Sequence, residues 1–288
     1  MLASPALRYC AIVAGTILWD AGAVLQKTAV DAMPDPRLKV GLLASSPRWM
    51  AGLLVTGIGW GLYVFGLQAV GVAAARTVTG GSYVVLALFS VLFLRSRLRL
   101  PEWIAVTLVT AGILLLGRTE PGGAVPGTAA PAAARVWEGL GMIAVTCAAL
   151  LALTRAGPRV SRLVPPFALY AGLSGLLSSA GDMMVRLILA GPAPVLFGAC
   201  AAGLIVLYLA GFYMLSRAYR SGTMVAGVVL SDFSARLGAM ALGAVALGEP
   251  LLGAVGSGYE RGAGFLLVLC GSLLLGRFST SAREVARA

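Results

Sequence analysis

Long apolar segments alternate with short polar segments along the whole chain. A membrane-spanning helix needs about 20 mostly apolar residues, because the hydrocarbon core of a bilayer is about 30 Å thick. The segments that approach this requirement are 8–30, 49–70, 72–94, 101–117, 137–154, 166–190, 194–215, 222–247 and 262–277. The pattern therefore predicts an all-α, polytopic membrane protein with about nine transmembrane helices.

The composition supports this prediction and excludes several other classes of protein. Of the 288 residues, 59% are hydrophobic and 11% are charged, whereas about a quarter of the residues in a soluble domain are charged. The chain has no His, so His-based metal sites, proton relays and Ser-His-Asp catalysis are excluded. The four cysteines are far apart and form no CxxC motif. We therefore expect no catalytic residues, no metal site and no cofactor, and the protein is not expected to be an enzyme.

The basic residues predict how the chain is oriented in the membrane. The chain holds 22 Lys and Arg against 11 Asp and Glu; of the basic residues, 14 lie in one set of loops and the C-terminal tail, and 4 lie on the other side. Cytoplasmic loops carry the excess of Lys and Arg in membrane proteins. The bias predicts a multi-pass protein of the plasma (inner) membrane, with the N-terminus outside and the C-terminus in the cytoplasm.

Two parts of the chain resemble each other at an offset of 159 residues. The heptapeptides Gly112–Arg118 and Gly271–Arg277 match at this offset, which also places Gly22 on Gly181 and Gly52 on Gly211. A shift of five helices reverses direction across the membrane, so the pattern predicts an inverted-topology repeat. The predicted parts are a first four-helix repeat, an outer linker with a connecting helix, and a second four-helix repeat with a cytoplasmic tail: 1–118, 119–165 and 166–288. Chance similarity between Gly- and Leu-rich helices is the alternative.

A small number of charged residues lie inside the predicted spans. A charge at the centre of a bilayer costs at least about 2.5–3.5 kcal/mol, so these side chains are expected to face the protein interior or water. Several of them are spaced by four residues with other polar residues, which places them on common helix faces. We predict that these faces line a substrate or ion pathway formed by Asp20, Lys27, Arg76, Tyr83, Ser178, Asp182, Arg186, Asp232 and Arg236.

Other interpretations of these residues remain open at this point. Asp182 with Arg186, and Asp232 with Arg236, have the spacing of ion pairs within one helix, which would neutralise each other. The ammonium of Lys27 could instead extend to the membrane surface. In span 49–70, Gly57 and Gly61 form a GxxxG motif that predicts close helix packing rather than a binding site.

Short motifs along nearly the whole chain resemble the drug/metabolite transporter (DMT) superfamily, in the branch nearest the EamA-type and NIPA-like proteins. The segments that carry the resemblance are Gly22–Lys27, Trp49 to Gly52, Gly66–Gly71, Arg97–Trp103 and Ala246–Leu251. The resemblance implies two inverted helix bundles around a central cavity, and transport by alternating access.

We therefore predict a secondary active transporter that moves a small polar or amphipathic metabolite, with Asp20, Asp182 or Asp232 as candidates for proton coupling. NIPA-like relatives suggest a second hypothesis, a divalent-cation (magnesium) transporter with these three carboxylates as ligands. A lipid-handling or non-transporting membrane scaffold is the third hypothesis. The predicted spans contain four basic residues and three acidic residues, and this balance favours an organic anion or zwitterion as the substrate. The expected partners are a small-molecule substrate and membrane lipids, and no nucleic acid is expected. A homodimer is one possible oligomeric state.

Overall fold

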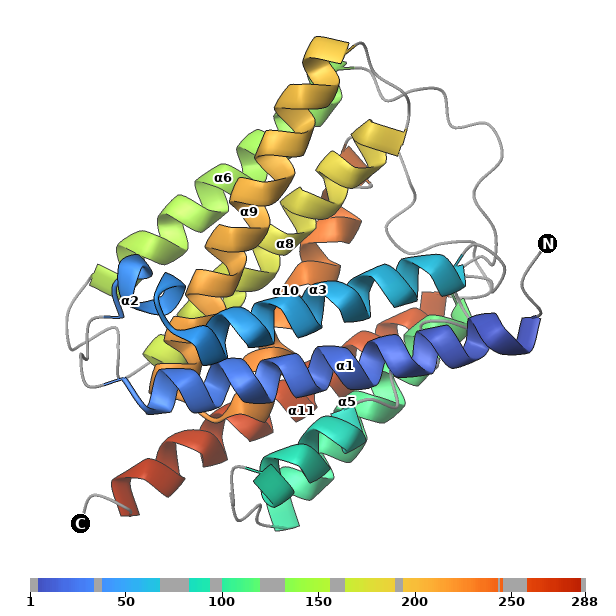
Figure 1. Cartoon of the computed structure of the whole chain (residues 1–288). Helices are drawn as coiled ribbons and strands as arrows, with labels where there is room; N and C mark the ends of the chain where they lie inside the picture. Colours follow the sequence, from blue (N-terminus) through green and yellow to red (C-terminus); the bar gives the residue numbers. More distant parts are fainter. Residues whose placement is uncertain are drawn as a thin grey trace. The chain divides into compact units, whose positions relative to one another are not determined.

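The computed structural model describes most of the chain as helices that form two compact units (Figure 1). The described residues are 5–33, 38–67, 83–93, 100–119, 133–155, 164–189, 194–242, 244–245 and 258–285. The first unit comprises Met1–Val125, Thr223–Ala226 and Ala254–Ala288, and the second comprises Pro126–Gly222 and Gly227–Gly253. The prediction of an all-helical, polytopic membrane protein is confirmed.

The helices follow the predicted spans closely. The first unit holds α1 (Pro5–Asp31), α2 (Val40–Ala44), α3 (Pro47–Leu67), an unlabelled helix Tyr83–Phe93, α5 (Leu100–Thr119) and α11 (Gly258–Val285). The second unit holds α6 (Ala133–Arg155), α8 (Pro166–Leu189), α9 (Pro194–Ser221) and most of α10 (Met224–Leu242). Only the last part of predicted span 72–94 lies within the described residues.

Proline marks the beginning of several helices. Pro47, Pro166 and Pro194 are the first residues of α3, α8 and α9. This position suits proline, because its missing N–H would have no partner in the first turn and its φ angle is already helical. At the start of α3 the Ser46 hydroxyl accepts a hydrogen bond from the backbone N–H of Trp49 at 3.4 Å. The helix α2 was not predicted, since its five residues are too few to show a helical period.

Four helices in the described parts of the chain are long and apolar enough to cross a membrane, namely Tyr9–Asp31, Pro47–Gly66, Leu196–Ser221 and Met224–Leu242. Four shorter apolar helical stretches accompany them. Large apolar side chains remain exposed along these helices, for example Leu54 and Val206, which are 65% and 64% exposed. Apolar exposure of this kind is expected where helices face acyl chains instead of water.

Helices α1 and α3 pack backbone against backbone through glycines. A Cβ placed on Gly15 would lie 2.6 Å from the carbonyl oxygen of Gly59, and a Cβ on Gly22 would lie 2.7 Å from that of Gly52. The reverse tests on Gly59 and Gly52 give 2.6 and 2.8 Å. The earlier glycine of α1, Gly15, meets the later glycine of α3, Gly59, and Gly22 meets the earlier Gly52, so the two helices run antiparallel. Small residues permit this close approach in membrane helices.

Among the described residues, the close packing predicted for the GxxxG motif is not made by Gly57 and Gly61. Gly57 and Gly61 lie on the exposed side of α3, and no described atom would come within 4 Å of a Cβ on either. The close contacts are made instead by Gly52 and Gly59, seven residues apart, which share the face of α3 turned to α1.

Helices α5 and α11 form a second close antiparallel pair in the first unit. A Cβ on Gly112 would lie 2.7 Å from the carbonyl oxygen of Gly264 and 2.7 Å from the Val268 side chain. A Cβ on Gly271 would lie 2.7 Å from the carbonyl oxygen of Ala105 and 2.6 Å from the Val109 side chain. The backbones are thus in contact at two levels along the pair.

In the second unit α8 is packed against α6, α9 and α10. Ile143, Ala180, Met183 and Leu242 form a buried apolar cluster, which joins α6, α8 and α10. The contact between α8 and α10 is partly polar, because the Ser231 hydroxyl donates a hydrogen bond to the Ser174 hydroxyl at 3.1 Å in a buried position. These packed faces hold the polar residues of α8 in place.

Candidate functional site

Helix α1 buries two of the charged residues that the sequence placed within a span. Asp20 is 7% exposed and Lys27 is 6% exposed. Thr16, Asp20 and Lys27 lie within about 40° of one another around the helix at 3.6 residues per turn. This polar face is turned away from the glycine face that contacts α3, because Gly22 lies about 160° from Asp20 around the helix. Both charged side chains are therefore buried in the described part of α1.

The ammonium of Lys27 extends along α1 toward its last residue. Its Nζ lies 2.6 Å from Oδ1 of Asp31, which is 46% exposed. The side chain therefore points toward the helix end, as the alternative interpretation proposed, but it ends in an ion pair and is itself buried. Lys27 is held by a carboxylate that solvent can reach.

Asp20 is in a different situation. Its Oδ2 is buried and makes no hydrogen bond to any residue that the structure describes. A buried charged group without compensation costs several kcal/mol and is rarely retained without a role. Among the predicted pathway residues that the structure describes, Asp20 is the one with a buried polar side-chain atom that has no hydrogen-bond partner.

In the second unit the polar stripe of α8 faces toward α9. The Ser178 hydroxyl donates to the backbone carbonyl of Ser174 at 2.9 Å, and both lie beside Gly211 of α9. The Tyr208 hydroxyl, also on α9, donates a hydrogen bond to Oδ1 of Asp182. Asp182 is an exposed residue. Arg186 belongs to α8, but its side chain lies outside the described residues.

Asp232 and Arg236 form an ion pair within α10. Nε of Arg236 donates to Oδ2 of Asp232 at 2.7 Å, and the side chains are 13% and 34% exposed, respectively. The neutralising ion pair that the spacing allowed is therefore present. It does not remove the cost of taking both ions out of water, so its place inside a predicted span still requires a reason.

The remaining predicted residues are Tyr83, which is buried near the start of the helix Tyr83–Phe93, and Arg76, which lies outside the described residues. The structure brings together Lys27 with Asp31 and Asp232 with Arg236. The expectation that all pathway residues face one chamber stays a prediction, because they belong to two units that are each described separately. Within the described ranges, no group of three or more His, Cys, Asp or Glu residues could hold a metal ion.

Sequence reasoning missed Tyr208 and Gln26. Tyr208 lies 26 residues from Asp182, and a single aromatic residue in an apolar span gives no signal of such a pairing. Gln26 was visible as an uncharged polar residue in the first span, next to Lys27. It is 1% exposed, and neither atom of its side-chain amide has a hydrogen-bond partner among the described residues.

Comparison with known proteins agrees with the resemblance seen in the sequence. No curated protein and no solved structure matches the chain. The family model of the EamA-like transporter family matches residues 38–118, which include α2, α3, the helix Tyr83–Phe93 and most of α5. Over these residues the chain is similar to the EamA-like transporters of the DMT superfamily, a family of transporters rather than enzymes, and this confirms the resemblance that its motifs indicated.

Proposed function

We propose that the protein is a secondary active transporter that moves a small polar or amphipathic metabolite across the plasma membrane by alternating access. The EamA-like match supports a transporter of DMT type. The observation that carries the proposal further is Asp20, whose carboxylate is buried within α1 with one oxygen unpaired among the described residues. A buried carboxylate is a site at which a proton or a cationic group can bind and leave during a transport cycle.

The charges of α1 and α10 support an organic anion or zwitterion as the substrate. Lys27 and Arg236 are each held by a carboxylate four residues away on the same helix, at 2.6 and 2.7 Å. A substrate carboxylate or phosphate can take the place of such a partner, because the cation then keeps a charge-assisted hydrogen bond. Each of these two pairs would be neutral at rest, and its cation would become available to an anion when the pair opens.

The contact between α5 and α11 supports the inverted repeat. At the offset of 159 residues, Gly112 corresponds to Gly271 and Ala105 corresponds to Gly264. The contact between Gly112 and Gly264 therefore has an equivalent in the contact between Gly271 and Ala105. In both contacts a Cβ on the first glycine would lie 2.7 Å from the carbonyl oxygen of the second residue. Two equivalent halves related in this way are the basis of alternating access in many transporters.

Flux measurements in proteoliposomes test the proposal. A thermal-shift screen with organic anions and zwitterions would first identify a ligand of the purified protein. The proposal predicts uptake of that ligand into vesicles and faster uptake when a pH gradient is imposed. Uptake of Mg²⁺ and of no organic solute would support the cation-transporter hypothesis instead, and the absence of any flux would support the scaffold hypothesis.

A further inference from the structure

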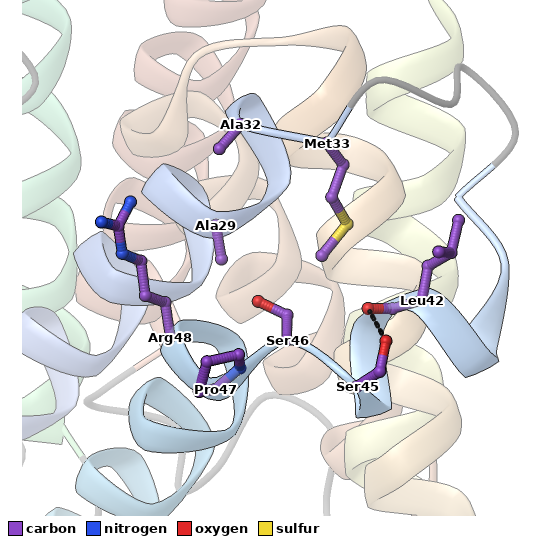
Figure 2. Close-up of a pocket in the computed structure, with 8 residues that line it drawn as sticks. All are labelled: Ala29, Ala32, Met33, Leu42, Ser45, Ser46, Pro47 and Arg48. Atoms are coloured by element: carbon purple, nitrogen blue, oxygen red, sulfur yellow. Dashed lines mark hydrogen bonds between the residues drawn. The ribbon is translucent and has the colours of Figure 1, made fainter.

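A cavity of about 330 Å³ lies where the end of α1, the short helix α2 and the beginning of α3 meet (Figure 2). The residues that line it are Ala29, Ala32, Met33, Leu42, Ser45, Ser46, Pro47 and Arg48. All of them belong to the first unit. In Figure 2 the side chain of Ser46 lies between Arg48 on one side and Met33 on the other. The cavity thus has a cationic side and an apolar side.

The polar groups of the cavity are suited to an anion. Arg48 is exposed, and its guanidinium forms no ion pair with the described carboxylates. The Ser46 hydroxyl accepts from the N–H of Trp49, which leaves its own proton available to a ligand. The first turn of α3 adds the partial positive charge of a helix N-terminus. The nearest carboxylate along α1 is that of Asp31, which is engaged by Lys27.

A buried amide lies close to this cavity in α1 but does not line it. Gln26 is one turn before Ala29 on the same face of α1, and a Cβ on Gly52 of α3 would lie 2.8 Å from its Cγ. Gly52 is in turn one turn after Arg48. Both polar atoms of the Gln26 side chain lack a hydrogen-bond partner among the described residues, although the residue is 1% exposed. The two amide atoms have almost no accessible surface, so a ligand in the cavity does not touch them.

An exposed apolar stripe continues from the cavity along the outer face of α3. Met50, Leu54 and Ile58 follow Pro47 at helical spacing and are 37%, 65% and 59% exposed. In the sequence, Arg37 and Lys39 lie between α1 and α2, and Arg48 lies in the first turn of α3. This part of the chain is predicted to be cytoplasmic. Anionic lipids are concentrated in that leaflet and attract basic residues near the surface.

We propose that this cavity binds the phosphate-bearing headgroup of an anionic phospholipid, whose acyl chains lie along the α3 stripe. The Arg48 guanidinium and the Ser46 hydroxyl bind the phosphate. An organic phosphate without acyl chains would satisfy the polar groups but not the stripe. This inference does not rest on the proposed transport function.

Lipid titration of the purified full-length protein tests the proposal. The affinities for short-chain phosphatidylglycerol and phosphatidylcholine would be compared in the wild type, Arg48→Gln and Lys39→Gln. Lys39→Gln is the control, because it removes an exposed charge directly before α2 from a residue that does not line the cavity. We expect Arg48→Gln to weaken phosphatidylglycerol binding by about tenfold, because it removes a charge-assisted contact. Lys39→Gln should change this affinity by less than about threefold, since it removes only long-range attraction. Phosphatidylcholine, whose ammonium group neutralises its phosphate, should bind the wild type more weakly than phosphatidylglycerol does. Thermal denaturation at the wild-type temperature shows that the variants are folded.

A second variant tests the buried amide. Gln26→Met keeps the length of the side chain but removes its polar atoms, and it should change the affinity for phosphatidylglycerol by less than about threefold, because the amide does not line the cavity. Equal affinities for the two lipids in the wild type, or equal losses in Arg48→Gln and Lys39→Gln, would overturn the proposal. Inorganic phosphate that displaces phosphatidylglycerol at the same concentration would also overturn it, because the site would then take a free anion.

Discussion

The pairs α1·α3 and α8·α9 carry glycines at matching positions but pack in different ways. In α1·α3, Gly22 meets the backbone of Gly52 beside the Thr56 hydroxyl, so the two backbones are in direct contact. In α8·α9, the corresponding Gly181 meets the ring of Tyr208, and Gly211 meets the Ser174 carbonyl and the Ser178 hydroxyl. The Tyr208 ring and the Ser178 hydroxyl thus lie between the two helices at these positions, whereas the Ser174 carbonyl meets Gly211 directly and at a longer distance than in α1·α3.

This difference in packing accompanies a difference in the charged residues. The pair that is closed by glycine holds Asp20 and Lys27 in buried positions. The pair that is spaced by side chains leaves Asp182 exposed and gives it a hydrogen bond from Tyr208. Backbone contact cannot adjust without moving a whole helix, whereas a ring or a hydroxyl can change its rotamer. We infer that α1·α3 moves as one body and that α8·α9 can rearrange locally.

Glycine-to-alanine substitutions at the matching positions should show the largest difference in stability between the two helix pairs. Gly22→Ala places a Cβ 2.7 Å from a backbone oxygen, so we expect a net loss of about 1–3 kcal/mol in the free energy of unfolding. Gly181→Ala places its Cβ 3.0 Å from the edge of a ring that can turn, and the gain in helix propensity of up to about 1 kcal/mol should offset most of the cost. Thermal denaturation of the purified variants measures both effects.

Gly57→Ala is the matched control for this comparison, because the position is open and lies in the same helix as Gly52. It should leave the melting temperature unchanged or raise it slightly. If Gly22→Ala and Gly181→Ala were equally destabilising, the distinction between a rigid and an adjustable pair would be lost.

The hydrogen bond from Tyr208 to Asp182 should have the next largest effect. Tyr208→Phe removes the donor and keeps the ring, and hydrogen bonds to charged groups contribute about 1.5–3 kcal/mol in soluble proteins and less in membranes. We expect a loss of about 1–2 kcal/mol in stability. Tyr259→Phe serves as the control, because Tyr259 is 89% exposed. A melting temperature equal to that of the wild type in Tyr208→Phe would show that the ring alone separates the helices.

The smallest effect is expected for the buried contact between Ser174 and Ser231. A double-mutant cycle with Ser174→Ala and Ser231→Ala measures the coupling between the two hydroxyls, which are 3.1 Å apart. Hydrogen bonds between membrane helices average about 0.6 kcal/mol in such cycles. A coupling energy near this value would agree with a contact that can break and re-form, whereas one well above about 2 kcal/mol would contradict an adjustable second unit.

The spans could be predicted from the sequence because bilayer thickness imposes a minimum length on each apolar helix. The five residues of α2 are too short for this reasoning. The contacts between helices were harder to predict, because a GxxxG motif shows which residues are small but not which face meets a partner. The seven-residue spacing shared by Gly15 with Gly22 and by Gly52 with Gly59 was the more informative signal.

The candidate site was predictable in part. The cost of charge within a bilayer identified Asp20 and Lys27 before their burial was known, and the spacing of Asp232 and Arg236 indicated their ion pair. The role of Tyr208 depends on a contact between two helices, and the lack of partners for Gln26 depends on the packing around it. Neither property is visible in the order of residues along one helix.

The most direct test of the account is the transport activity of Asp20→Asn. The substitution keeps the size of the side chain and removes its charge, so stability should be unchanged or increased while uptake of the identified solute falls by about tenfold or more. Glu260→Gln, which neutralises an exposed carboxylate in the first turn of α11, should transport like the wild type. Uptake by Asp20→Asn at the wild-type rate, with the same response to a pH gradient, would contradict the proposal that the buried carboxylate of α1 serves transport.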